Sequence, residues 1–184
     1  VAGRGISPEN QYKFALYWGN GRIYIPVYYD GKLVNYVGRA AWWYDTGIKR
    51  YAYATGASTR NYLFNWDSAK LWSSVVLVEN TFNAIWLSDY CYATTNFGSD
   101  LSKVQIDLLA KSKVKNVVFL WDEGAEHAAN RARNRLNTIG LQATVLRISG
   151  QPDDHKIENL LPWIEYSLAN PDKKAIIDSR TETT

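Results

Sequence analysis

The sequence has one cysteine, no methionine and no long apolar run in its 184 residues. The single thiol, Cys91, excludes a disulfide framework and a four-cysteine zinc site within this chain, and it fits a reducing compartment. No apolar stretch approaches the ~20 residues of a transmembrane helix, and no signal-peptide pattern opens the chain. These absences predict no membrane partner and a cytoplasmic location. Because methionine is missing altogether, we expect a processed chain or an excised fragment.

Charged and aromatic residues are unevenly distributed. Residues 1–72 hold nine Lys or Arg and four Asp or Glu, whereas residues 73–184 hold twelve and fourteen. Five of the eight tryptophans and ten of the thirteen tyrosines also lie in residues 1–72. A basic, aromatic half beside an acidic half suggests a polyanion platform joined to a metal site. The alternative is that the aromatic side chains fill a small β-rich core and the lysines solvate it.

Two apolar runs that end in carboxylates organise the second half of the chain. Residues 75–79 read Val-Val-Leu-Val-Glu, and residues 117–121 are followed by Asp122, Glu123 and Gly124. Short apolar runs of this kind predict buried parallel strands. Helical signals follow each run, and strand-to-helix junctions lie at the carboxyl edge of an α/β sheet, where such sheets bind ligands. The pattern therefore predicts acidic groups at one edge, which suits an oxygen-ligated cation such as Mg²⁺.

The local signals on either side predict two kinds of structure. In the first half we expect a helix from Ser7 to about Trp18, two strands around an Asp-Gly hairpin turn, and irregular strands and loops up to residue 72. In the second half strands and helices alternate, which predicts an α/β fold with a mainly parallel sheet flanked by helices. The expected strands are 22–28, 33–39, 75–79, 90–95, 117–121 and 143–148. The expected helices of the second half are one that follows Glu79, with Asn80 or Thr81 as cap and an apolar face over 84–87, and the helices 99–109, 125–138 and 156–169.

Some details of these elements are specific enough to check. Ser99 or Asp100 is expected to cap the helix that ends near Leu109. The last helix is expected to be interrupted near Pro162. The tail after Pro171 is polar and is expected to be disordered. The apolar face of the helix 99–109 is expected to consist of Leu101, Val104, Leu108 and Leu109.

Two stretches resemble the first motifs of the Toprim domain, the metal-binding fold shared by primases, topoisomerases and some nucleases. Residues 79–83 read Glu-Asn-Thr-Phe-Asn and resemble its Glu-Gly-x-x-Asp motif, with Asn80 and Asn83 in place of Gly and Asp. Residues 94–102 resemble the Ala-x-x-Gly step that precedes a helix in that family.

Two later stretches resemble the remaining Toprim motifs. Asp122 matches the first Asp of the Asp-x-Asp motif, while Gly124 stands at the second position, and Glu123 or Glu126 could substitute for the missing carboxylate. Residues 150–154 read Gly-Gln-Pro-Asp-Asp and resemble the family's last acidic loop.

The first half resembles the N-terminal subdomain of bacterial- and phage-type DNA primases. Residues 3–7 are similar to the family's Arg-Gly-Ile-Ser start, residues 25–39 match its hairpin ending in Gly-Arg, and residues 49–51 resemble its Lys-Tyr step. Each motif is short, but their order identifies residues 3 to about 160 with the catalytic core of such a primase. The resemblance implies a basic α+β primase subdomain over 1–72, a Toprim domain over 73–155, and a C-terminal helix and tail over 156–184.

The resemblance also implies a reaction, namely metal-dependent nucleotidyl transfer with Mg²⁺ or Mn²⁺. Ribonucleoside triphosphates would be joined into a short RNA primer on single-stranded DNA, with a replicative helicase as a further partner and, for a phage-encoded chain, the host cytoplasm as the location. Glu79 and Asp122 are the candidate catalytic residues. The candidate metal ligands are Glu79, Asp122, Glu123, Asp153 and Asp154. The candidate residues for binding nucleotide or template are Arg4, Arg39, Lys49, Arg50 and Tyr51.

Structural and functional alternatives remain open. Carboxylates in a first helical turn favour the helix dipole without binding metal, and cations at a hairpin end are often only solvated. The segment 42–44 (Trp-Trp-Tyr) could stack on bases, although core packing is the more frequent role. His127 reads as an exposed helix residue and Cys91 as a buried strand residue. The rival functions are a Toprim nuclease and a degenerate Toprim module that only binds nucleic acid, which the altered motifs favour.

Overall fold

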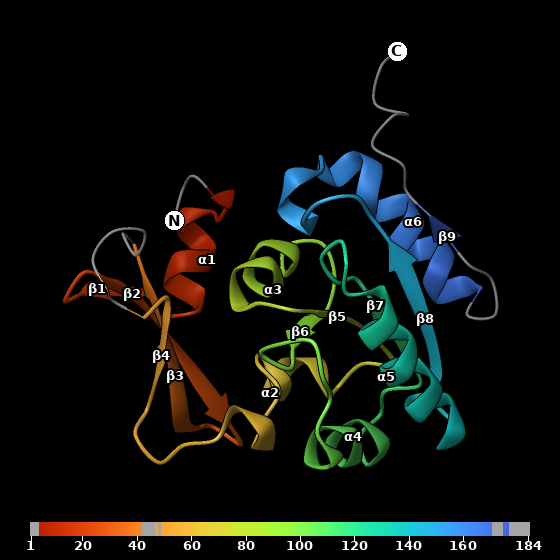
Figure 1. Ribbon diagram of the computed structural model, residues 1–184, viewed down its shortest axis with the longest axis horizontal. Coiled ribbons are helices and arrows are strands. Elements are labelled where there is room, and N and C mark those ends of the chain that lie inside the picture. Colours follow the sequence, from red (N-terminus) through yellow and green to blue (C-terminus); the bar gives the residue numbers. More distant parts are fainter. Residues whose placement is uncertain (1–3, 42–46, 48, 171–174, 177–184) are drawn as a thin grey trace.

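The computed structural model describes residues 4–41, 47, 49–170, 175 and 176, which form two β-sheets with helices (Figure 1). The N-terminal sheet is antiparallel with the order β1-β2-β3-β4, and the parallel sheet has the order β6-β5-β7-β8-β9. The strands are β1 Tyr17–Gly19, β2 Arg22–Tyr29, β3 Lys32–Ala40, β4 Tyr51–Tyr53, β5 Ser74–Val78, β6 Ala93–Thr95, β7 Asn116–Phe119, β8 Gln142–Arg147 and β9 Ala175–Ile176. The helices are α1 Pro8–Lys13, α2 Trp66–Ala69, α3 Thr81–Leu87, α4 Lys103–Ala110, α5 Glu126–Thr138 and α6 Ile157–Ala169, with the 3₁₀ helices η2 Thr59–Asn61 and η3 Pro152–Asp154. The predicted α/β fold with a parallel sheet after an antiparallel unit is confirmed.

Two short turns shape the N-terminal sheet. The Asp30-Gly31 turn joins β2 to β3 with positive φ at both residues, +48° and +72°, as a type I′ hairpin requires. Asn20-Gly21 has the same conformation, with φ of +47° and +69°. This second turn pairs Tyr17–Gly19 with β2, so the prediction that the first helix extends to Trp18 was wrong. Helix α1 starts after the cap Ser7, as predicted, and ends at Lys13.

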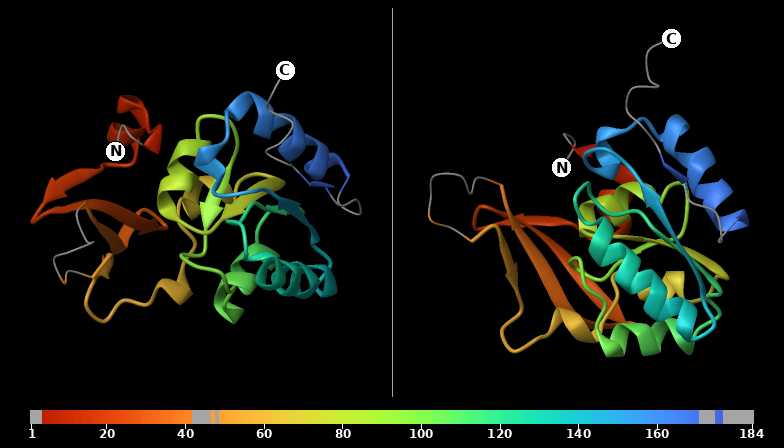
Figure 2. Two further views of the ribbon diagram at one scale, coloured as in Figure 1. Left: turned by 45° about the horizontal axis from the view of Figure 1, so that its top comes forward. Right: turned by 45° about the vertical axis from the view of Figure 1, so that its right-hand side comes forward.

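The parallel sheet is buried on both faces. Val76 and Val78 contribute to a core cluster that also contains residues of α3, α6 and the N-terminal sheet. Val75 and Leu77 point the other way, into a cluster with α4 and α5. This division follows from the two-residue period of a strand. The first cluster therefore joins the two sheets, which Figure 2 shows side by side.

The register of the parallel sheet places the ends of β5 and β7 together. Leu77 of β5 pairs with Phe119 of β7, and the Leu120 N–H donates to the Leu77 carbonyl at 3.0 Å. Glu79 follows β5 directly, and Asp122 follows β7 after two further buried residues. Both carboxylates therefore lie at the carboxyl edge, as the apolar runs predicted.

Two features of the predicted elements were wrong, one for a local and one for a tertiary reason. Strand β6 covers only 93–95, because Cys91 donates its N–H to the Leu87 carbonyl in the turn that ends α3; Cys91 is partly buried but not in a strand. Helix α6 runs through Pro162 without interruption, while its buried Leu160 and Ile164 belong to the core beside β7 and β8.

Helix α4 also differs from the prediction, because it begins at Lys103 after the cap Ser102. Ser102 and Gln105 form a reciprocal capping box, and the buried Gln105 amide donates to the carbonyls of Thr59, Tyr62 and Asn96 at 2.8–3.2 Å. The predicted apolar face fails at Val104, which is 44% exposed, while Leu101 is buried just before the helix. Most of the predicted tail after residue 171 lies outside the described residues, but residues 175 and 176 pair with β8 as β9. Among the described helices, none has the length and apolar character needed to cross a membrane.

Candidate active site

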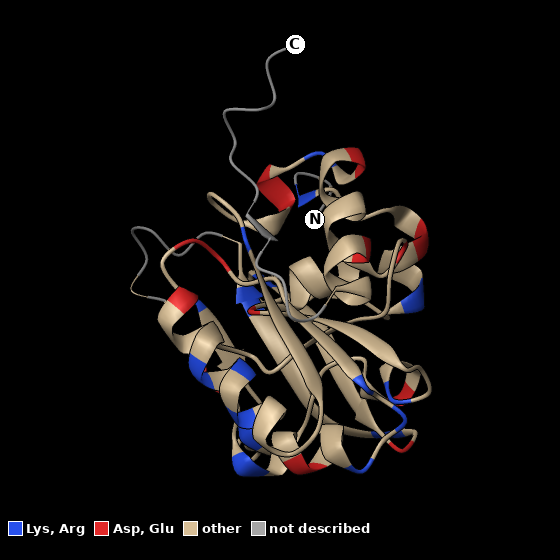
Figure 3. Cartoon of the chain, turned by 90° about the vertical axis from the view of Figure 1, so that its right-hand side faces the viewer, with Lys and Arg blue, Asp and Glu red and all other residues tan. Residues whose placement is uncertain are grey.

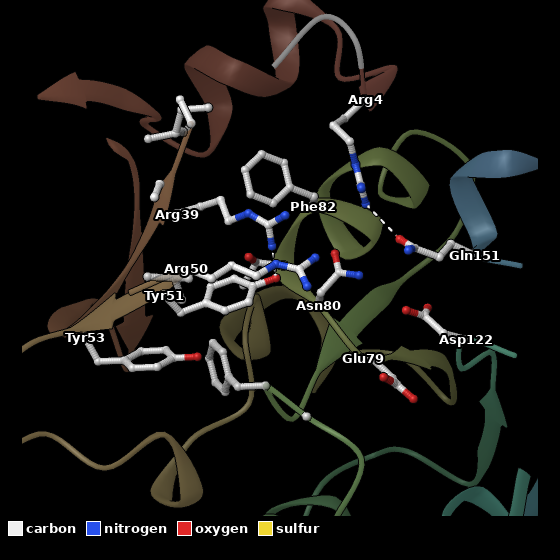
Figure 4. Close-up of a pocket in the computed structure, with 17 residues that line it drawn as sticks. Arg4, Arg39, Arg50, Tyr51, Tyr53, Glu79, Asn80, Phe82, Asp122 and Gln151 are labelled. Atoms are coloured by element: carbon white, nitrogen blue, oxygen red, sulfur yellow. Dashed lines mark hydrogen bonds between the residues drawn. The ribbon is translucent and has the colours of Figure 1, made fainter. Parts of the chain in front are cut away.

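A pocket of about 470 Å³ lies between the N-terminal sheet and the carboxyl edge of the parallel sheet. One wall carries Arg39 of β3, Tyr51 of β4 and the preceding Arg50. The opposite wall carries Glu79 and Asp122, which follow β5 and β7 (Figure 4). The pocket thus places cationic and anionic side chains across from one another.

Glu79 and Asp122 form a pair of partly buried carboxylates. Each has one buried oxygen without a hydrogen-bond donor, Oε1 of Glu79 and Oδ1 of Asp122. Burial, followed by the charge of Asp122, raises the pKa of Glu79 to about 7. The pKa of Asp122 is also raised, mainly by burial and then by the charge of Asp153, while Arg4 opposes this shift. Two carboxylates with raised pKa values and free oxygens at a cavity edge are a functional-site signature.

The other three predicted metal ligands have partners of their own. Asp153 forms a two-pronged ion pair with Arg4, with Nε–Oδ2 at 2.7 Å and Nη2–Oδ1 at 3.2 Å. Asp154 Oδ2 accepts the Gln151 N–H at 2.8 Å. Glu123 Oε2 accepts the Gly150 N–H at 2.9 Å. Over the described residues, no cluster of three His, Cys, Asp or Glu side chains forms a ready-made metal site.

Arg4 ties the start of the chain to both acidic motifs. Its Nη2 donates to Asn83 Oδ1 at 3.2 Å and to Gln151 Oε1 at 3.4 Å, in addition to the ion pair with Asp153. Asn83 lies in α3, and Gln151 and Asp153 lie in the loop after β8. Arg4 therefore lines the pocket as a residue held in place by three side chains (Figure 4).

The wall that faces Glu79 and Asp122 is an arginine–tyrosine cluster. Arg39 donates to the Tyr51 hydroxyl, and its guanidinium lies 4.8 Å from the Tyr51 ring centre. The Arg50 guanidinium lies 5.5 Å from the same ring. Burial lowers the pKa of Arg39 from its ordinary value, with the neighbouring charge of Tyr51 opposing this shift. Lys49, also a predicted binding residue, is exposed and does not line the pocket.

Gly124 shows how the chain departs from the Asp-x-Asp pattern. Its φ of +91° favours glycine, although a Cβ there would meet no atom within 4 Å. The Gly124 N–H donates to Glu126 Oε1 at 3.1 Å, and hydrogen bonds from the backbone of Glu126 itself and then of Gly124 lower the pKa of Glu126. The Glu126 side chain thus folds back on the start of α5. This agrees with the alternative that Glu126 is a carboxylate of a first helical turn that does not bind metal. His127 is exposed at a shallower hollow on the far side of the carboxylate pair, also as expected.

Sequence reasoning missed several residues of the pocket. Tyr53 lines it two residues beyond Tyr51, where the period of a strand could have indicated it. Burial raises the pKa of the Tyr53 hydroxyl. Phe82 and Phe97 add apolar surface from the parallel-sheet side, and no sequence signal distinguished them from core residues. The predicted stacking segment 42–44 lies outside the described residues.

No protein-family model matches the sequence, and no curated protein matches it. Solved structures do match. The primase of Aquifex aeolicus, with zinc-binding and RNA polymerase domains, superimposes with a TM-score of 0.74 at 19% identity over 92% of this chain and 54% of that chain. A DNA primase domain from Pseudomonas aeruginosa gives 0.71 at 18% identity, over 84% and 64%. The primase fragment of the bacteriophage T7 primase-helicase gives 0.65 at 16% identity, over 92% and 73%.

This chain has the fold of a DnaG-type primase catalytic core. It spans about half of the Aquifex chain and about two thirds of the Pseudomonas chain. The likeness to both bacterial and phage primases confirms the fold that the ordered motifs implied for this chain. The predicted domain limits remain a prediction.

The raised pKa of Glu79 predicts a pH-dependent stability difference in metal-free buffer. Because this pKa rises from 4.5 to about 7, the stabilising effect of the neutral form is complete below about pH 4.5 and is lost as the pH rises through 7. Glu79→Gln should therefore raise the melting temperature at pH 8 by about 2–4 °C, after discounting for partial exposure, and change it little near pH 5. Thermal denaturation with a chelator present measures this. Glu165→Gln, on the exposed side of α6, is the control, and an equal effect of Glu79→Gln at both pH values would contradict the assignment.

Proposed function

We propose that this chain is an RNA-primer-synthesising nucleotidyltransferase that acts on single-stranded DNA with ribonucleoside triphosphates. The observation that carries the proposal is the pocket in which a carboxylate pair, Glu79 and Asp122, faces the Arg39–Arg50–Tyr51 wall. Nucleotidyl transfer requires negatively charged phosphates to be held beside a group that activates a 3′-hydroxyl. The primase fold around the pocket supports this reaction over other uses of a carboxylate pair.

The matched structures support the choice of partners. One contains the DnaG primase catalytic domain bound to single-stranded DNA, with a TM-score of 0.60 at 17% identity. Another is a fragment of the T7 primase-helicase protein. We therefore propose single-stranded DNA as template and a replicative helicase as partner, in the cytoplasm where replication takes place. A phage-type origin stays a prediction, since bacterial and phage structures both match.

The carboxylate pair fits one divalent cation. Mg²⁺ in polymerase-type sites is bound by one or two carboxylates together with substrate phosphates. Among the described carboxylates, Glu79 and Asp122 each have a buried oxygen without a donor, Oε1 and Oδ1, so these oxygens are the proposed ligands for Mg²⁺ or Mn²⁺. When bound, such an ion neutralises phosphate charge and orients the attack. Asp153, Asp154 and Glu123 remain secondary candidates because each already accepts hydrogen bonds.

The side chains of the pocket divide the remaining tasks. Arg39 and Arg50 hold the phosphates or the template backbone, since guanidinium groups bind phosphate in two-pronged geometry. Glu79, with a pKa near 7, accepts the proton of the attacking hydroxyl when it is not occupied as a ligand. Arg4 positions the acidic loop by holding Asp153 and Gln151. The Tyr51 ring orients both arginines of the wall.

The altered motifs favour one second candidate, nucleic-acid binding without catalysis. Gly124 and Asn83 replace two carboxylates of the Toprim pattern, which leaves two free carboxylates in the described pocket. A Toprim nuclease would use the same groups to cut a phosphodiester. Incubation with single-stranded DNA, labelled ribonucleotides and Mn²⁺ separates the three functions, because only a primase elongates, only a nuclease shortens, and a binding module does neither.

The catalytic assignment predicts large losses from neutral substitutions. Glu79→Gln and Asp122→Asn should each lower primer synthesis by at least about 100-fold, or roughly 2.7 kcal/mol in the barrier, with the fold intact by circular dichroism. Glu126→Gln is the matched control, because Glu126 bonds to Gly124 rather than facing the pair, and it should keep activity. Activity of Glu79→Gln within about threefold of wild type would remove Glu79 from the mechanism.

The metal assignment predicts opposite effects at two positions. Asp122→Asn should weaken Mn²⁺ binding at least about tenfold, measured by calorimetry or electron paramagnetic resonance without substrate. Gly124→Asp should bind Mn²⁺ more tightly than Gly124→Ala. Both Gly124 variants share the backbone strain of the positive φ, of about 1 kcal/mol, and only one adds a carboxylate. Unchanged affinity in Asp122→Asn would favour the binding-only function.

The arginine wall predicts a salt-dependent contribution to DNA binding. Arg39→Ala and Arg50→Ala should weaken binding of single-stranded DNA across sequences alike, and each should reduce the slope of affinity against salt by about one counterion. Lys49→Ala is the control cation, because Lys49 lies outside the pocket, and it should have a smaller effect. Fluorescence anisotropy at several salt concentrations tests this, and an equal effect at all three positions would show that the pocket does not direct binding.

A further inference from the structure

The N-terminal sheet has an unusual composition for a surface element. Its strands contain seven tyrosines and one tryptophan, but no Asp or Glu. The cations on these strands are Arg22, Lys32 and Arg39. A sheet that presents aromatic rings and only positive charge is suited to a polyanion that also carries flat apolar groups.

One face of this sheet is turned away from the protein core. Ile25, Val27 and Val37 are buried in the core shared with the parallel sheet, so the two-residue period places Tyr24 and Tyr36 on the opposite face. Tyr17 of β1 pairs with Tyr24 and lies on the same face. Tyr28 continues the alternation of β2. No described helix lies over this outer side of β1–β3 in Figures 1 and 2.

Three tyrosine rings of this face, those of Tyr17, Tyr24 and Tyr36, form a contiguous layer. The Tyr17 and Tyr24 rings are stacked, with centres 5.0 Å apart and planes at 13°, and Tyr36 meets Tyr24 edge-on at 5.4 Å. The Tyr24 ring lies against Gly38, where a Cβ would come within 3.0 Å of it, and its other edge faces Gly19. Neither glycine has positive φ, so they leave room for the ring rather than for a turn.

A purely structural role accounts for only part of this layer. A ring lying over glycines stabilises the sheet, which explains Tyr24. It does not explain Tyr17 and Tyr28, which remain 57% and 45% exposed and belong to no core cluster. The exposed Tyr17 ring of the stacked pair and the exposed Tyr28 ring farther along β2 leave aromatic surface open to a further flat group.

We propose that the tyrosine face, defined by Tyr17, Tyr24, Tyr28 and Tyr36, stacks unpaired bases of single-stranded DNA outside the active-site pocket. The inference deepens the proposed function and rests on it for the choice of ligand. Arg22 supports the path, because it pairs in register with Ala40, which lines the pocket, and its side chain donates to the Gly38 carbonyl at 3.2 Å. A single strand of DNA that leaves the pocket at this end of β2 and β3 would meet the Arg22 side chain first and then the tyrosine rings.

The test compares oligothymidylates of about 6 and about 18 nucleotides by fluorescence anisotropy. Wild type should bind the longer DNA more tightly. The double substitution Tyr17→Ala with Tyr28→Ala should remove about tenfold of that gain and leave binding of the short DNA unchanged. When Tyr17 is replaced by Phe instead of Ala in the double variant, the part of the affinity gain that Tyr17 contributes should return, since phenylalanine keeps the stacking ring. The matched control is Tyr12→Ala on α1, because Tyr12 is 90% exposed but lies off the tyrosine face.

Photocrosslinking with iodouracil-substituted DNA gives a second readout, with the linked residue identified by mass spectrometry as Tyr17 or Tyr28. Unchanged affinity of the double variant for the longer DNA would overturn the inference. So would a finding that the substitutions abolish self-association instead, since the face would then bind a second copy of the chain. If the protein makes no primers but the length-dependent gain still requires Tyr17 and Tyr28, the tyrosine face stands and only the proposed activity fails.

Discussion

Two like charges at adjacent strand ends are the constraint on which the rest of this structure depends. The parallel register of β5 and β7 brings Glu79 and Asp122 to the same edge, and both side chains keep a buried oxygen without a donor. Burial raises the pKa of each group, and the charge of Asp122 adds to the rise at Glu79 while that of Asp153 adds to the rise at Asp122, so the pair costs stability at neutral pH. The two apolar clusters that cover the two faces of the parallel sheet stabilise the fold and offset that cost. A fold that maintains such a pair supports a function in which a cation or a proton occupies the free oxygens.

The charges around the pair are arranged so that the site is not neutralised by the protein itself. The charges of Arg4 and then of Arg50 oppose the rise in the pKa of Asp122, but the hydrogen bonds of Arg4 go to Asp153, Asn83 and Gln151. Arg39 of β3 and Arg50, which directly precedes β4, lie close to the Tyr51 ring on the far wall. Away from the pocket, the cations of α5 are arginines, Arg131, Arg133 and Arg135, which lie along this helix (Figure 3). The pocket therefore keeps separated charges, an arrangement that favours a ligand with phosphates at one end and a bound cation between.

The sequence predicted the strand ends well because their signals are local. The apolar run before Glu79 and the one before Asp122 each specify a buried strand, and parallel strands meet at one edge. The partners of Asp153, Asp154 and Glu123 could not be predicted, since they come from segments distant in sequence or from backbone groups in loops. Competing local signals explain other misses. Ser7 and Pro8 correctly indicated the start of the first helix. Its predicted end was wrong, because the Asn20-Gly21 turn pairs residues 17–19 with β2 in a hairpin.

The two neutral residues in the acidic motifs preserve local geometry while removing charge. Asn83 still accepts a hydrogen bond from Arg4 through Oδ1, as an aspartate would, and Gly124 keeps open space where a side chain would stand. Carboxylates at both positions would add negative charge beside a pair whose pKa values are already raised. Their absence lowers that repulsion, but it also removes oxygen ligands. In the proposed reaction the missing ligands must then come from the phosphates of the bound nucleotide, so that the full site forms only when protein and substrate meet. Such an arrangement couples cation binding to substrate binding, and it makes the arginine wall, which holds the phosphates, as necessary for the site as the carboxylates opposite.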